Sequence, residues 1–260
     1  RIEERITPKT KAIMAVHTYG LPVDMQPVLQ IAEKYDLKII EDAAEAIGQN
    51  YCGRPCGSFG DVSIFSFYAN KHVTTGEGGM IATNNTNIAT HCKNGRNLFF
   101  GNSTDRFKHK KLGWNMRLSN LQAAVGVAQI ESLQATLRRK RDMGLLYTEL
   151  LSDQPGIQLP TPNTDFAKNH YWVFGVVLDE MSSLTVTDAM RQLGELGVGT
   201  RPFFLPMHEQ PIFQEMGLFH EEKFPVSEKL ARFGFYLPSG AAITDQQIEY
   251  VAKKVRLVLS

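Results

Sequence analysis

The sequence contains few cysteines, almost no net charge and no long apolar run, and each absence argues against a class of protein. Three cysteines, Cys52, Cys56 and Cys92, are too few for a disulfide scaffold and suggest a reducing compartment, the cytoplasm. Cys52 and Cys56 have no second Cys/His pair at zinc spacing, so we expect free thiols and no metal site. A net charge of +1 gives no reason to expect nucleic acid or an anionic membrane as a partner. No apolar run approaches the about 20 residues of a membrane span, and the polar N-terminal residues do not resemble a signal peptide.

The sequence does contain an alternation of short apolar runs and amphipathic segments. Its 260 residues, 43% hydrophobic and 21% charged, suit one large domain or one medium and one small domain. Residues 11–17 and 37–42 predict two buried strands, and the helix between them begins after a capping Asp24, which makes a parallel βαβ unit. Residues 61–67 and 79–84 predict two more strands. We therefore expect an α/β sheet covered by helices on both faces.

The second half begins with the longest predicted helix, over residues 119–151. Ser119 and Gln122 fit a capping box at its start, and the basic run 138–141 is expected on a solvated face of this helix. A Pro- and Asn-rich stretch then marks a boundary. A strand at 171–178 and two helices capped by Thr185 and Thr244 predict a smaller α/β unit. We expect a large domain over residues 1–150 and a small domain over residues 151–260.

Several residues with chemical potential follow the strands of the first half. Asp42 ends a strand, where an unpaired buried charge is costly, so a cation is expected beside it. Lys71 lies in a loop after the next strand, as a Schiff-base lysine can, and Ser66 precedes it. An aspartate facing a pyridinium nitrogen and a lysine nucleophile together indicate pyridoxal phosphate. Taken singly, Asp42 could cap a turn, Lys71 could be a surface lysine, and the glycines of the "TTGEGG" loop could be turn residues.

Four longer segments carry a resemblance to a known family. They are "EDAAEAIG" (41–48), "GSFGDVSIFSFYANKHVTTGEGGMIATNN" (57–85), "LGWNMRLSNLQAAVGVAQIE" (112–131) and "RPFFLPMHEQP" (201–211). In this order they resemble the DegT/DnrJ/EryC1/StrS family of sugar-nucleotide aminotransferases. The resemblance implies an α/β fold of the pyridoxal phosphate-dependent aminotransferase type I, with a large and a small domain. It also implies transfer of an amino group from glutamate to a 4-keto-6-deoxy sugar nucleotide for polysaccharide synthesis.

The family pattern assigns a role to each matching residue of the cofactor site. Lys71 matches the lysine that binds the cofactor covalently and later moves a proton, and Asp42 matches the partner of the pyridine nitrogen. Glu45 falls near the ring hydroxyl of the cofactor, and Ser66 matches a serine on its phosphate. Asn115 matches an asparagine that reaches the phosphate held by the other subunit, so the resemblance implies a homodimer with shared active sites.

On the substrate side the pattern is less definite. His17 and His208 match positions that line the sugar-nucleotide site, although either could be a packed structural histidine. Arg117 and Arg201 could make bidentate contacts to a phosphate or a substrate carboxylate, or lie in ordinary surface ion pairs.

Two other functions stay open. A dehydratase branch of the family replaces the lysine by histidine; here Lys71 occupies the position and His72 is its neighbour, which favours transamination. The family pattern also implies roughly a hundred residues before Arg1, with a turn that cradles the cofactor phosphate at a helix N-terminus. The other alternative is therefore an inactive fragment or paralogue.

Overall fold

The computed structural model of the chain describes residues 1–101, 104, 106–219 and 221–259. It divides into two compact units. Unit 1 comprises Arg1–Arg138 and Asn163–Trp172, and unit 2 comprises Arg139–Pro162 and Val173–Ser260. The division falls inside helix α4 (Leu133–Leu151), and a short segment of the second half of the chain belongs to unit 1. The domain boundaries predicted from the sequence remain a prediction.

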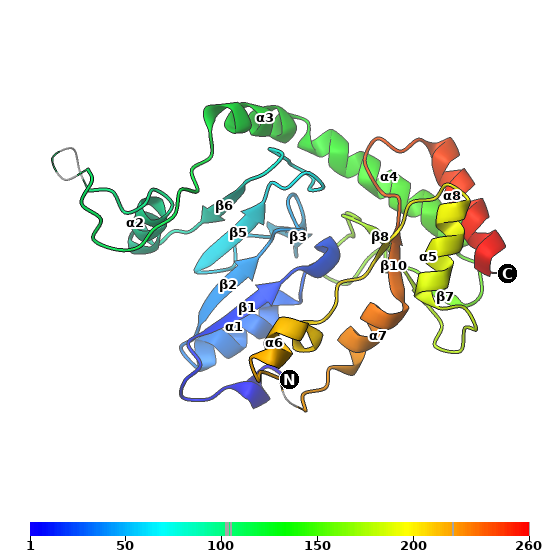
Figure 1. Cartoon of the computed structure of the whole chain (residues 1–260), viewed down its shortest axis with the longest axis horizontal. Coiled ribbons are helices and arrows are strands. Elements are labelled where there is room, and N and C mark those ends of the chain that lie inside the picture. Colours follow the sequence, from blue (N-terminus) through cyan, green and yellow to red (C-terminus); the bar gives the residue numbers. More distant parts are fainter. Residues whose placement is uncertain (102–103, 105, 220, 260) are drawn as a thin grey trace. The chain divides into compact units, whose positions relative to one another are not determined.

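Unit 1 is built on a four-stranded sheet in the order β1-β2-β5-β6 (Figure 1). The strands are β1 (Ala12–Val16), β2 (Lys38–Asp42), β5 (Val62–Ser66) and β6 (Gly79–Ala82). β1, β2 and β5 are parallel, whereas β6 is antiparallel to β5. Helix α1 (Met25–Lys34) connects β1 to β2, so the βαβ unit predicted from the sequence is confirmed. The carboxyl ends of β2 and β5 therefore meet at one edge of the sheet.

The core of unit 1 lies between the sheet and α1. Because strand side chains alternate between faces, Ile13 and Ile39 point to the same side and pack with Val28 of α1. On the opposite face, Met14 is 58% exposed and Val16 is 42% exposed. In the described part of the chain this face is therefore less covered than the sequence led us to expect.

The start of α1 is stabilised differently from the prediction. Asp24 is the N-cap residue, but its side chain accepts no hydrogen bond from the first turn of the helix. Its carboxylate instead accepts a hydrogen bond from the hydroxyl of Tyr51. That hydroxyl in turn accepts a hydrogen bond from the backbone N–H of Gln26 at 3.1 Å. A tyrosine distant in sequence thus satisfies a free N–H of the helix start, and Asp24 orients it.

The rest of unit 1 is made of short elements and the first part of the long helical region. The predicted helix over 119–151 is in fact two helices, α3 and α4, separated at Ser132, although the capping box of Ser119 and Gln122 is confirmed. The remaining elements are η1 (Glu3–Arg5), η2 (Thr18–Gly20), β3 (Asn50–Tyr51), β4 (Arg54–Pro55), α2 (Thr86–Gly95) and α3 (Asn120–Glu131).

Unit 2 contains an antiparallel sheet in the order β7-β8-β10-β9. Phe174, Leu193, Phe235 and Ile248 lie at the centre of its core. The caps predicted at Thr185 and Thr244 are present. No helix in the described ranges is long and apolar enough to cross a membrane. Besides α4, the elements are β7 (Ile157–Gln158), β8 (Phe174–Leu178), α5 (Val186–Glu195), β9 (Arg201–Pro202), η3 (Met207–Glu209), α6 (Pro211–Glu215), α7 (Pro225–Phe233), β10 (Gly234–Leu237) and α8 (Asp245–Leu259).

The basic run 138–141 does not lie wholly on a solvated face, as the sequence suggested. Lys140 is only 3% exposed, and its ammonium group donates to the backbone carbonyl of Ser239. Burial lowers the pKa of Lys140 to about 7. Arg139 forms an ion pair with Asp245, 2.7 Å between Nη1 and Oδ1. Two of the basic residues thus tie α4 to neighbouring segments of unit 2.

Candidate active site

Glu41 and Asp42 stand side by side at the carboxyl end of β2 but serve opposite faces of the sheet. Glu41 is fully buried, whereas Asp42 is half-buried. The Glu41 carboxylate accepts hydrogen bonds from side chains and from a turn of backbone N–H groups, which is a common way to satisfy a buried anion. The donors to Oε1 are His17 Nε2 and Gly57 N, and those to Oε2 are Phe59 N, Gly60 N and Ser63 Oγ.

These hydrogen bonds decide the charge of Glu41. Burial by itself would raise the pKa of this carboxyl, but the hydrogen bonds from His17 and the backbone outweigh burial and hold the pKa below its ordinary value. His17 is 1% exposed, and its Nδ1 accepts the backbone N–H of Val23 at 3.2 Å. The proton of the neutral imidazole therefore sits on Nε2, which donates to Glu41 at 2.9 Å. Both ring nitrogens of His17 are engaged, and its contact with a substrate stays a prediction.

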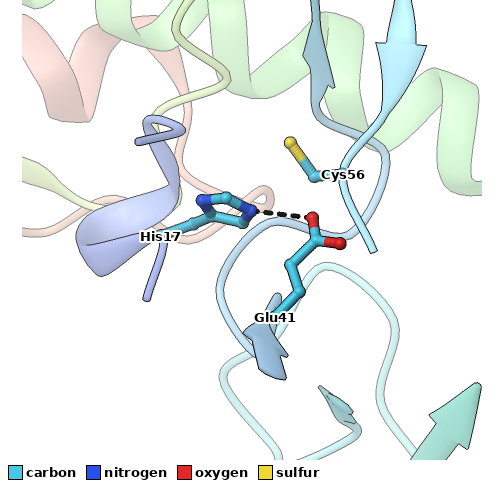
Figure 2. A group of neighbouring side chains, drawn as sticks. All are labelled: His17, Glu41 and Cys56. Atoms are coloured by element: carbon cyan, nitrogen blue, oxygen red, sulfur yellow. Dashed lines mark hydrogen bonds and ion pairs between the residues drawn. The ribbon is translucent and has the colours of Figure 1, made fainter. Parts of the chain in front are cut away.

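Cys56 lies beside this pair (Figure 2). One potential ligand atom from each of His17, Glu41 and Cys56 lies within 4.8 Å of the other two, a spacing that a metal ion could bridge. The existing contacts argue otherwise: both ring nitrogens of His17 already have hydrogen-bond partners, and burial raises the pKa of the Cys56 thiol to about 12. A metal ion would also have to displace donors that already saturate Glu41. We interpret the group as a structural hydrogen-bond network.

Asp42 has a freer carboxylate. Its Oδ1 accepts the backbone N–H of Ala44 at 3.0 Å, and it forms no ion pair with a basic side chain in the ranges that the structure describes. The backbone of β2 is fixed on both sides by pairing with β1 and β5, with Asp42 opposite Ile64. The strand end therefore presents a negative charge in a fixed position to whatever binds there.

Glu45 and Lys71 form the second ionic feature of the site. Lys71 Nζ lies 3.4 Å from Glu45 Oε1, and the two side chains are only 11% and 14% exposed. Glu45 Oε2 accepts the backbone N–H of Tyr19 at 2.6 Å. Burial raises the pKa of Glu45, partly offset by the Tyr19 N–H and by Lys71, while the charge of Asp42 raises it further. The pair therefore combines an amine with a carboxyl group that retains a proton more readily than an exposed glutamate.

Ser66 ends β5, next to β2 in the sheet. Its Oγ accepts the backbone N–H of Tyr68 at 3.3 Å, which leaves the hydroxyl proton for another acceptor. The backbone N–H of Lys71 bonds to the carbonyl of Tyr68 at 3.0 Å, so Ser66 and Lys71 flank one tight turn. Gly76, in the following loop, has a φ of +78°, a conformation that favours glycine.

The other predicted site residues belong to other segments of the chain. Asn115 and Arg117 are exposed in the segment before α3, and their side chains approach each other at 3.4 Å. Arg201 and His208 belong to unit 2. Arg201 is exposed on β9, and His208 is buried, with Nε2 3.0 Å from Glu228 Oε1. The substrate and phosphate contacts expected of these residues stay predictions.

Sequence reasoning missed Trp172 as a neighbour of this site. It was predicted to be part of a strand at 171–178, but β8 begins only at Phe174 and Trp172 belongs to unit 1. The ammonium nitrogen of Lys71 lies 4.0 Å from the centroid of the Trp172 ring. No pattern in the sequence links two residues so far apart.

Comparisons with known proteins identify the family and the fold of this chain. The profile of the DegT/DnrJ/EryC1/StrS aminotransferase family matches residues 1–256. GDP-perosamine synthase of Caulobacter vibrioides is 36% identical over 263 residues, which cover 100% of this chain and 69% of that protein. GDP-perosamine synthase of Escherichia coli O157:H7 is 36% identical, covering 98% and 67% of the two chains. The crystal structure of DesI with its TDP-sugar product superposes with a TM-score of 0.86 at 30% identity, covering 98% of this chain and 64% of DesI. The expected type I aminotransferase fold is thereby confirmed.

Proposed function

This chain belongs to the DegT/DnrJ/EryC1/StrS aminotransferase family, and on that premise we propose that it transfers the amino group of glutamate to the 4-keto carbon of a 6-deoxy sugar nucleotide. The observation that carries the proposal is the cluster of Lys71, Glu45 and Asp42 at one edge of the sheet, where Asp42 forms no ion pair with a basic side chain of the described residues. Enzymes of the family are pyridoxal phosphate-dependent sugar aminotransferases, and this chain is an enzyme of that class.

The relatives support the finer choice of substrate. Two proteins that are 36% identical to this chain are GDP-perosamine synthases, and DesI was solved with a TDP-sugar product. We take the product to be a perosamine-type 4-amino sugar that is later incorporated into a surface polysaccharide. The low cysteine content supports a location in a reducing compartment such as the cytoplasm.

The residues at the sheet edge suit pyridoxal 5′-phosphate. The carboxylate of Asp42, which has no cationic partner within the part of the chain that the structure describes, fits a protonated ring nitrogen. The partly buried amine of Lys71 fits a covalent attachment, and the O–H of Ser66 is free to donate to a phosphate oxygen. When bound, pyridoxal phosphate supplies an electron sink that makes the carbon next to the transferred nitrogen acidic.

Each side chain then has a defined task. Asp42 would keep the ring nitrogen of the bound cofactor protonated, which would preserve the electron-withdrawing power of the ring. Lys71 Nζ would hold the cofactor and would also carry a proton as a general base and acid. Glu45, whose pKa is raised by burial, can share a proton with a neighbouring oxygen at neutral pH. The backbone N–H of Tyr19 donates to the Glu45 carboxyl at 2.6 Å and fixes its position.

We also propose that the active form is a homodimer with shared active sites. A band of apolar side chains before and along α3 supports it, since apolar patches of this kind mark protein interfaces. Leu112 is 96% exposed and Leu121 83% exposed, with Trp114, Met116 and Val125 also exposed. Asn115 lies within this band, which is the position expected of a residue that reaches a partner's cofactor.

The test is product formation by the purified chain. The protein is supplied with pyridoxal phosphate, glutamate and each of a set of GDP-, UDP- and TDP-linked 4-keto-6-deoxy sugars, and products are identified by mass spectrometry. We expect one sugar nucleotide to gain an amino group in equal amount to the 2-oxoglutarate formed. Loss of a hydroxyl at C3 without nitrogen gain would indicate a dehydratase instead. No product with any donor and acceptor, in a protein that binds the cofactor, would refute the proposal.

A further inference from the structure

The aromatic ring beside Lys71 stacks on a second aromatic ring. The Trp172 and Tyr19 rings are stacked, with centroids 6.3 Å apart and an interplanar angle of 16°. The Lys71 ammonium nitrogen lies 4.0 Å from the centroid of the Trp172 ring and 3.4 Å from the Glu45 carboxylate. The amine is thus placed between an aromatic face and an anion, both of which attract a cation.

The tryptophan is fixed from several sides. Its indole N–H donates to the backbone carbonyl of Asn70, the residue before Lys71, at 3.0 Å. A Cβ added to Gly20 would lie 3.1 Å from the Cβ of Trp172, so the backbone at Gly20 approaches the tryptophan closely. Trp172 is 4% exposed. Since a buried ring with these contacts cannot change rotamer without breaking them, Trp172 is a rigid platform.

We propose that Trp172 is a positioning residue for Lys71, whose indole face receives the lysine ammonium group whenever Lys71 is not covalently engaged, while its N–H fixes the backbone of the lysine turn. Transamination needs such a resting place, because the lysine must leave the cofactor and return to act on a proton nearby. An amine held against a fixed ring stays close to the reacting atoms, whereas the amine of a freely rotating lysine side chain does not.

The role of Trp172 as a positioning residue rests on the proposed function, but the contact between Lys71 and Trp172 does not. We therefore test that contact in protein free of cofactor. Reductive methylation with formaldehyde and cyanoborohydride is followed by mass spectrometry, with the rate at Lys71 divided by the rate at exposed Lys9 in the same sample. We expect Trp172→Leu to raise this ratio roughly tenfold and Trp172→Phe, which keeps an aromatic face, to raise it about twofold. Tyr250→Leu, which removes an exposed aromatic ring with its own lysine, Lys254, 5.1 Å from the ring centroid, should leave the ratio unchanged.

An unchanged ratio in natively folded Trp172→Leu protein would overturn the proposed contact. If that variant does not fold, the fluorescence emission of Trp172 tests its contact with Lys71. In a Trp114→Phe background Trp172 is the only tryptophan of the sequence. Lys71→Met should then shift the emission maximum, because a cation leaves the indole face, while Lys9→Met should not. Identical spectra for the two lysine variants would refute the contact. Failure of borohydride to trap cofactor on Lys71 would instead refute the proposed function and leave the contact intact.

Discussion

Glu41 and Asp42 are adjacent in sequence, yet one carboxylate is saturated with protein hydrogen bonds and the other has no protein cation in the described structure. The alternation of side chains along β2 separates them. Glu41 ties the turn at Gly57–Gly60 to the sheet, and Asp42 faces the other side of the sheet, where we propose that the cofactor binds. One strand end thus combines a structural anion with an anion available for chemistry.

Lys71 should carry the cofactor. Borohydride reduction of the loaded protein should fix the pyridoxyl label on the tryptic peptide that contains Lys71, because only that amine forms the covalent bond. Lys71→Ala should abolish turnover, while Lys9→Ala at an exposed turn should retain it. A label on any other lysine would disprove the assignment.

Asp42→Asn should impair catalysis without unfolding the protein. The amide keeps the shape but removes the charge that holds the ring nitrogen protonated, so we expect kcat to fall about 10²–10³-fold. Asp36→Asn, the same change at the exposed loop before β2, is the matched control and should leave kcat unchanged. Steady-state kinetics and thermal melts on both variants make the comparison; near-normal turnover of Asp42→Asn would rule out this role.

Glu41→Gln should destabilise unit 1. A buried carboxylate is replaced by an amide whose NH₂ faces other donors, and we expect a loss of about 3 kcal/mol in the free energy of unfolding. The pKa of Glu41 in the folded protein lies below its ordinary value of 4.5, so its contribution is complete above that pH and is lost as pH falls below it. Urea midpoints of wild type and variant should therefore differ at pH 7 and converge at acidic pH. A difference that persists or grows in acid would contradict this account.

Glu45 should titrate above an ordinary glutamate. Burial raises its pKa above 4.5, and Lys71 partly opposes that rise. The protonated-carboxyl infrared band that disappears in Glu45→Gln should therefore have a titration midpoint above 4.5 in cofactor-free protein. Replacing Lys71 by Met should move the midpoint higher still. A midpoint that falls in Lys71→Met would show that the pair is not coupled as the distance suggests.

The proposed dimer should depend on α3. Introducing Asp at both Leu121 and Val125 places charge on the apolar band and should convert a particle of twice 29.2 kDa into one of 29.2 kDa in light scattering. Val226→Asp, at another exposed apolar position on α7, should leave the mass unchanged. A wild-type protein that is monomeric at micromolar concentration would count against the dimer and the role of Asn115.

Local patterns explain what the sequence predicted correctly. The βαβ unit, the caps at Ser119, Thr185 and Thr244, and the placement of Asp42 at a strand end all follow from local periodicity and capping patterns. The errors arose where distant segments meet. Tyr51 replaces Asp24 as the hydrogen-bond partner of the α1 start, and Ser239 draws Lys140 into the interior. Such contacts depend on tertiary packing, which no local pattern records.

Glu41 is a second case in which local sequence patterns did not predict a contact between distant segments. Sequence reasoning assigned a function to Asp42 at the strand end and none to Glu41, the residue before it. That Glu41 would find its partners in His17 and in the backbone of a turn at 57–60 was not visible, because backbone donors leave no trace in residue types.

The hydrogen bond from Trp172 to Asn70 also sets an order of events during synthesis. The two residues are 102 positions apart. A ribosome that adds about 5–20 residues per second needs roughly 5–20 s to cover that interval. Throughout this time β1, β2 and β5 can pair and α1 can pack, but the ring beside Lys71 has not yet been made. The surroundings of the reactive amine are therefore completed late, after the sheet that supports it, and the closing of this long loop adds an entropic cost to the last step of assembling unit 1.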